Sequence, residues 1–87
     1  MQQSIEEKLK MVVAALEEMS EDTSVPRNIR KGAAESKERL LRTDEPLDVR
    51  AASAVFKLDE MANDPNIPMH SRTQIWNIMS VLESLSK

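Results

Sequence analysis

The chain has 87 residues, enough for one small domain and too few for two. It contains no cysteine, so neither disulfide bonds nor a thiolate metal site can supplement its hydrophobic core. Its formal net charge of −3 does not favour a uniformly basic surface of the kind that binds nucleic acids.

Membrane insertion and secretion are not indicated by the hydrophobic pattern. No apolar stretch approaches the ~20 residues that a membrane-spanning helix needs. Residues 1–7 lack both the basic region and the apolar region of a signal peptide. We therefore expect a cytoplasmic protein that does not bind membranes.

The first predicted helix covers about residues 4–20. Ser4 and Glu7 have the spacing of a capping box, which marks the start of a helix. Apolar residues then recur every three or four positions and form one stripe. These are Ile5, Leu9, Val12, Leu16 and Met19, and the stripe is widened by Met11, Val13 and Ala15.

The second predicted helix covers about residues 25–42 and is the most weakly apolar. We expect Ser24 to cap it, with Pro26 in the first turn, where a missing N–H costs no helical hydrogen bond. Small residues around Gly32 would let a neighbouring helix approach closely. The inward positions are Ile29, Ala33, Leu40 and Leu41, with either Ser36 or Lys37 completing the stripe.

The third and fourth predicted helices cover about residues 45–63 and 67–86. We expect Asp44 and Asn66 to cap them, again one spacer residue before a proline. The inward positions of the third are Ala51, Ala52, Val55, Leu58, Met61 and Ala62. Those of the fourth are Ile75, Ile78, Met79, Leu82 and Leu85.

The chain repeats itself. The pattern of residues 16–26 returns 42 residues later as residues 58–68, and Arg30 returns as Arg72. Residues 40–52 are similar to a HEAT-type repeat, but such solenoids need about three repeats to bury their faces, and this chain has two. Two similar helical hairpins with short connections therefore predict an all-α, antiparallel, up-and-down four-helix bundle in a single domain, residues 1–87.

Over nearly its whole length, the sequence also resembles a small archaeal family of uncharacterised all-helical proteins. The resemblance implies a compact helical bundle in a cytoplasmic setting, and it implies no activity, cofactor or site residue. It is carried by residues 16–19, Asp22, residues 25–30, residues 49–52 and residues 64–68.

No pattern in the chain predicts catalysis. His70 is the only histidine, and one imidazole among scattered carboxylates is not a metal site, so we expect it to be an exposed residue without a role. We expect no catalytic residues, no cofactor and no metal, and therefore a protein that is not an enzyme.

Two repeated polar pairs, Asp22 with Arg30 and Asp64 with Arg72, could form a paired polar site at one end of the bundle. Alternatively, each arginine reaches back to its aspartate and closes the turn. The repetition favours the second interpretation, because turn geometry must be duplicated in a repeat whereas a catalytic site need not be.

The fourth helix gives the stronger indication of a binding surface. Its outward positions are almost uncharged, and the single tryptophan lies beside its core stripe, a composition typical of interface cores. The alternative is that this helix is simply the most buried and that Trp76 fills the centre of the bundle. The candidate interface residues are Gln74, Trp76, Asn77, Ser80 and Ser84.

The sequence thus predicts a non-catalytic protein–protein interaction or assembly module of unknown partner, with a homodimer as one form of it. A nucleic-acid-associated protein is the alternative, and it would use the basic face of the second helix. Its candidate contacts are Arg27, Lys31 and Arg42, although Glu35 and Glu38 interrupt that face.

Overall fold

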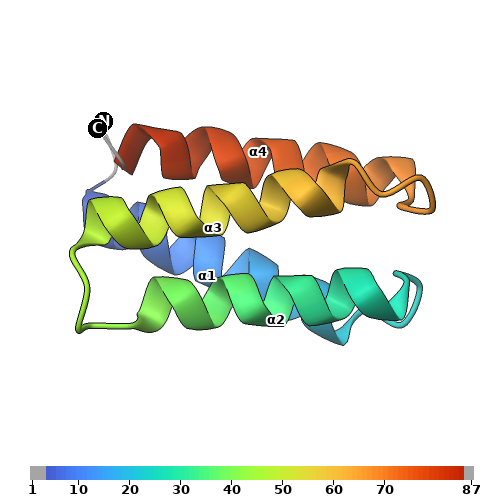
Figure 1. Ribbon diagram of the computed structural model, residues 1–87, viewed down its shortest axis with the longest axis horizontal. Helices are drawn as coiled ribbons and strands as arrows, with labels where there is room; N and C mark the ends of the chain where they lie inside the picture. The colour runs from blue at the N-terminus through green and yellow to red at the C-terminus, as the bar shows by residue number, and fades with distance from the viewer. Residues whose placement is uncertain (1–3, 86–87) are drawn as a thin grey trace.

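The computed structural model describes residues 4–85 and shows four α-helices in that range. They are α1 (Ile5–Glu21), α2 (Arg27–Leu41), α3 (Leu47–Ala62) and α4 (Met69–Leu85). Successive helices run in opposite directions, so α1 begins and α4 ends at the same end of the molecule (Figure 1). The predicted antiparallel four-helix bundle is confirmed. The predicted last residue of the fourth helix, 86, lies outside the described residues.

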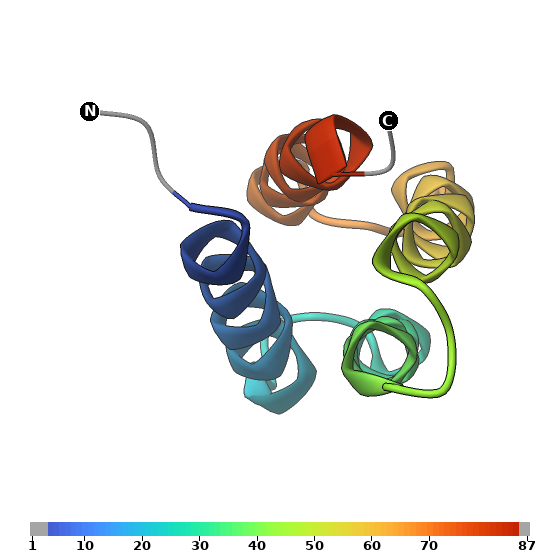
Figure 2. The same ribbon diagram turned by 90° about the vertical axis from the view of Figure 1, so that its left-hand side faces the viewer.

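The helices form a ring in chain order. Each packs against its neighbours in the sequence, and α1 and α4 close the ring with the least extensive contact of the four neighbouring pairs. Viewed from the end, α1 is visibly inclined to the other three helices (Figure 2). This inclination spreads α1 and α4 apart over part of their length.

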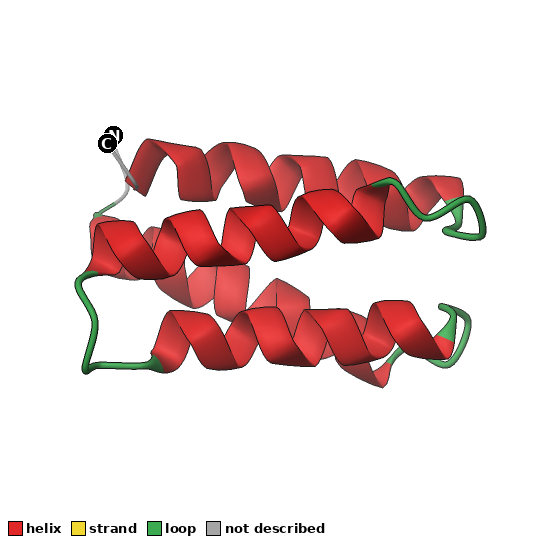
Figure 3. Cartoon of the chain, in the orientation of Figure 1, coloured by secondary structure: helices red, strands yellow, loops and turns green. Residues whose placement is uncertain are grey.

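The α1–α2 and α3–α4 turns lie at one end of the bundle, and the α2–α3 connection lies at the other (Figure 3). The repeated residues 16–26 and 58–68 therefore build the same end of the molecule twice. Val25 and Ile67 occupy equivalent positions in the two turns, and both side chains are buried. They anchor the turns to the core, a role that the helical stripes alone did not indicate.

The predicted caps of α2 and α3 are wrong. Pro26 and Pro46 themselves occupy the N-cap positions, without a side-chain capping bond, and their carbonyl oxygens accept the first helical amides. Ser24 instead donates its N–H and its hydroxyl to Asp22 Oδ1 within the preceding turn. The capping box of Ser4 and Glu7 at the start of α1 is confirmed.

Most predicted core positions are buried or half-buried, and four are exposed, one of them Met11, which is 57% exposed on α1. Leu41 is 51% exposed because it is the last residue of α2, and Ile5 is 58% exposed in the first turn of α1. Ala52 is exposed, and Ala54 takes the inward position of α3 instead. Ser36 rather than Lys37 completes the stripe of α2, because its hydroxyl donates to the carbonyl of Gly32 and so loses no hydrogen bond on burial.

None of the helices between residues 4 and 85 is both long enough and apolar enough to cross a membrane.

Candidate protein-interaction site between α1 and α4

An apolar groove of about 200 Å³ lies where α1 and α4 diverge. One side is formed by α1 through Met11, Val12 and Ala15. The other is formed by α4 through Gln74, Asn77, Ile78 and Val81. None of these side chains is charged, so a partner would not have to desolvate an ion in order to fill the groove.

The groove includes part of the surface predicted for the fourth helix. Gln74 and Asn77 line it, whereas Trp76, Ser80 and Ser84 are exposed and do not. Trp76 is 54% exposed, so it does not fill the centre of the bundle. Because it lies two residues from Gln74, it points to a different side of α4.

A polar depression of about 290 Å³ adjoins the groove at Gln74, which lines both. Its other lining residues are Glu18, Met19 and Asp22, from the end of α1 and the turn that follows. Hydrogen bonds from the Ser24 hydroxyl and then from its N–H lower the pKa of Asp22, with smaller contributions from the charges of His70 and Arg30. The apolar groove thus leads into a site that carries negative charge.

The lowered pKa of Asp22 predicts a pH-dependent contribution to folding. Its carboxylate stabilises the folded chain above the ordinary aspartate pKa of about 3.9, and that stabilisation is lost as pH falls through the lower folded-state value. We expect Asp22→Asn to reduce stability at pH 7 more than at pH 2.5. Urea unfolding at the two pH values checks this. An equal loss at both would show that the charge of Asp22 does not contribute.

The repeated arginines close the turns, as the second interpretation predicted, but through carbonyl oxygens. Arg30 donates from Nε to the carbonyl of Val25 at 3.1 Å. Arg72 donates from Nε to the carbonyl of Ala62 at 3.0 Å and from its terminal nitrogen to that of Asp64 at 3.3 Å. The aspartate side chains instead accept from backbone amides two residues further on. These pairs form structural turns rather than an open polar site.

The difference between the two arginines predicts different losses of stability. Arg72→Met removes donors from two carbonyls at the α3–α4 turn and should lower the free energy of unfolding by about 1–3 kcal/mol. Arg30→Met removes one such bond and should cost less, which makes it the matched control. Urea unfolding of both variants measures the difference. A larger loss for Arg30→Met would contradict this account of the turns.

Over residues 1–85 the sequence matches the model of an uncharacterised protein family, UPF0147. The chain belongs to this family. A UPF0147 protein of Methanocaldococcus jannaschii is 54% identical over 78 residues, covering 90% of this chain and 84% of the relative. A UPF0147 protein of Thermoplasma volcanium is 51% identical over 76 residues, covering 87% and 85%.

Two crystal structures share the fold. The protein MMP1188, of unknown function, has a TM-score of 0.93 at 46% identity and covers 100% of this chain and 99% of its own. A UPF0147 protein from Thermoplasma acidophilum has a TM-score of 0.89 at 47% identity, and the match covers 93% of this chain and 95% of that protein. The predicted resemblance to an uncharacterised archaeal family is therefore confirmed, and the function of the family is unknown.

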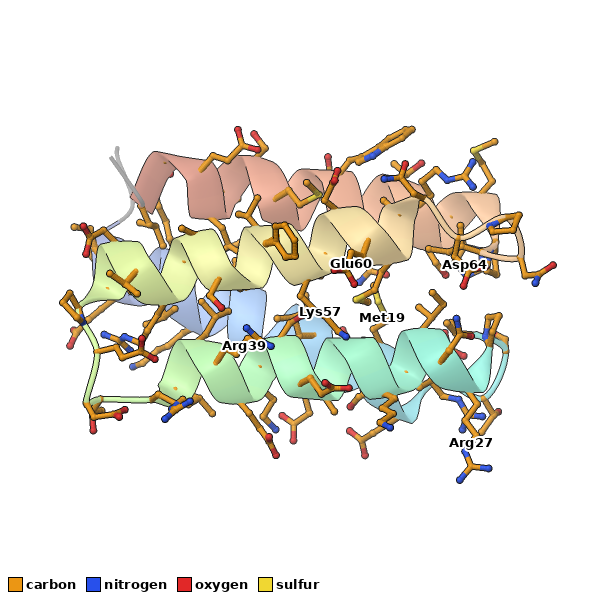
Figure 4. The ribbon with its side chains drawn as sticks, viewed as in Figure 1. Met19, Arg27, Arg39, Lys57, Glu60 and Asp64 are labelled. Atoms are coloured by element: carbon orange, nitrogen blue, oxygen red, sulfur yellow. The ribbon has the colours of Figure 1, made fainter. Side chains whose placement is uncertain are left out.

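Several basic residues of α2, and Arg42 directly after it, are engaged within the molecule in this UPF0147 chain. Arg42 lies 3.4 Å from Asp44 and 4.0 Å from Glu45, and Lys37 lies 3.4 Å from Glu17. Arg39 donates to the Ser53 hydroxyl between α2 and α3. The guanidinium of Arg27 points away from the bundle (Figure 4). The three predicted nucleic-acid contacts, Arg27, Lys31 and Arg42, are all exposed.

His70 is exposed, as predicted, in the first turn of α4. Within residues 4–85, no group of three or more histidine, aspartate or glutamate side chains is placed to hold a metal ion.

The sequence interpretation did not place α1 in the interaction surface. Met11 and Ala15 were recognised only as residues that widen the apolar stripe, and Val81 was not singled out. The width of the apolar stripe on α1 was the available signal for this part of the groove.

Proposed function

We propose that this UPF0147 chain is a cytoplasmic, non-catalytic protein-interaction module whose docking surface is the groove between α1 and α4. The observation that carries the proposal is the continuous uncharged lining of this groove in a chain whose exposed faces on α1 and α2 are heavily charged. Interface cores are depleted in charge in the same way. The weak closure of the ring by α1 and α4 supports it, since a further element seated there would bury the apolar atoms of both.

The experiment compares two alanine-to-arginine variants in partner capture from nuclease-treated native lysate. Ala15 lines the groove, whereas Ala52 is exposed on α3 and lines neither the groove nor the depression next to it. Ala15→Arg places a long charged side chain at the groove and should reduce capture at least ~10-fold, as the burial of an unpaired charge at an interface does. Ala52→Arg makes the same chemical change and should leave capture intact.

Thermal unfolding of both variants is the control that checks whether each variant is folded. Equal capture by wild type and Ala15→Arg would overturn the proposal. Partners captured only when the same lysate is left without nuclease would favour the nucleic-acid alternative through Arg27 and Lys31. That alternative is weaker because Arg42, the third residue of its basic face, is paired with Asp44 and Glu45.

A further inference from the structure

Two carboxylates line the depression that adjoins the α1–α4 groove, and they bear on the chemistry of its occupant. The groove itself is uncharged, and the depression that adjoins it at Gln74 carries Glu18 and Asp22. We propose that the groove binds an amphipathic helix of a partner protein, with apolar side chains in the groove and lysine or arginine side chains facing Glu18 and Asp22. This inference rests on the function proposed above.

The dimensions of the groove suit side chains of a helix. An apolar cavity of ~150 Å³ accommodates a benzene molecule, so 200 Å³ accommodates one leucine or phenylalanine side chain. The groove is bounded by two antiparallel helices, and a third helix can lie along such a pair with anchors at every third or fourth position. The amide groups of Gln74 and Asn77 can hydrogen-bond with polar side chains at the edge of such a helix.

The acidic end of the groove selects the charge of the partner. Glu18 is exposed and makes no hydrogen bond or ion pair within the described part of the chain, so its charge is available to an incoming cation. Asp22 is held ionised by Ser24, as described above. Complementary charge speeds association and orients the partner.

A second copy of this chain does not fit the groove in the same way. The strongly basic helix is α2, and its apolar residues Ile29, Ala33 and Leu40 are already buried in the bundle. The most exposed large apolar side chain among residues 4–85 is Phe56, which is 71% exposed on α3. Asp59 and Glu60 follow it on the same helix, so inserting Phe56 would bring acidic groups against the acidic end of the groove.

Two synthetic peptides test the proposal with the wild-type protein labelled with ¹⁵N. Both have leucine anchors at positions i, i+3, i+4 and i+7 of a helix, and they differ only in carrying lysine or glutamate at the flanking positions. We expect the lysine peptide to bind at least ~10-fold more tightly at low salt and to shift the amide signals of Ala15, Gln74 and Asn77. We expect Glu18→Lys to remove most of this preference, and Glu60→Lys, on exposed α3, to retain it.

Each alternative outcome overturns the inference. Equal affinity for the two peptides would show that charge does not select the partner, while amide shifts in the groove would still support the proposed function. Shifts confined to α2 or α3 would place the peptide elsewhere. If neither peptide binds and the wild-type protein forms a dimer that Ala15→Arg dissociates, a second copy of the chain is the occupant. If the two peptides bind equally but partner capture is still lost in Ala15→Arg, the charge selection is wrong and the proposed function stands.

Discussion

Replacement of Leu58 by alanine should lower the free energy of unfolding by about 3–5 kcal/mol, the largest loss that we expect from a single substitution in this chain. Leu58 is 0% exposed and lies in the one continuous core shared by the four helices. Truncation removes buried methyl groups and leaves a cavity that rigid helical neighbours fill only in part. Each kcal/mol lost lowers the melting temperature of a domain of this size by about 4–8 °C.

The measurement is urea unfolding followed by far-UV circular dichroism. Leu16→Ala, at the equivalent position of the first repeat and also 0% exposed, should show a loss of similar size. Leu41→Ala is the matched control, because Leu41 is 51% exposed, and its loss should stay below about 1 kcal/mol. Comparable losses for Leu41→Ala and Leu58→Ala would contradict the placement of the core.

Replacement of Gly32 by valine should destabilise the chain by about 1–3 kcal/mol, although valine is the better helix former. A methyl group at Gly32 would lie 2.6 Å from the sulfur and 3.0 Å from Cγ of Met61, closer than non-bonded atoms can pack. Gly32 therefore permits the close approach of α2 and α3, the contact that joins the two hairpins. Gly32→Ala should cost less, because the end of the methionine side chain can move and alanine favours the helix.

A double-mutant cycle isolates this contact. Met61→Ala alone should destabilise the chain by about 2–5 kcal/mol through its cavity. Combined with Gly32→Val, the loss should be smaller than the sum of the single losses by about 1 kcal/mol or more, since valine then occupies part of that cavity. Strict additivity would show that Gly32 and Met61 do not restrict each other.

The helices and their order could be predicted because apolar residues with a period near 3.6 determine which face is buried. The stripe of Val12, Leu16 and Met19 is an example, and all three are buried. The caps could not be predicted in the same way. Ser24 and Asp44 have suitable side chains, but the carbonyl oxygens of Pro26 and Pro46 accept the first helical amides. Ser24 instead donates a hydrogen bond to Asp22. Local competition between hydrogen-bond acceptors decides which group caps the helix, and residue type alone does not reveal the outcome.

The candidate site was only partly predictable for a geometric reason. The uncharged face of α4 was evident from composition, and two of its residues, Gln74 and Asn77, do line the groove. The other wall depends on the inclination of α1, which places Met11 and Ala15 opposite α4 without closing the space between them. An apolar stripe indicates which residues are buried, and it does not indicate the distance between two helices.

The repeat also explains why the strongest polar signals are structural. Arg30 and Arg72 both bind turn carbonyls, and Asp22 and Asp64 both accept amides within their turns. The α1–α4 groove, in contrast, does not belong to the repeated turns, because α1 and α4 meet without a connecting turn. The proposed binding surface therefore lies where the two hairpins close on each other.

Photo-crosslinking from position 77 tests most directly whether a partner covers the groove between α1 and α4. A benzophenone amino acid is placed at Asn77, in the groove, or at Ala52, on the exposed face of α3, and native lysate is irradiated. We predict a discrete protein adduct from position 77 that Ala15→Arg abolishes, and none from position 52. Adducts from position 52 alone, or an adduct from position 77 that Ala15→Arg leaves unchanged, would contradict the docking surface.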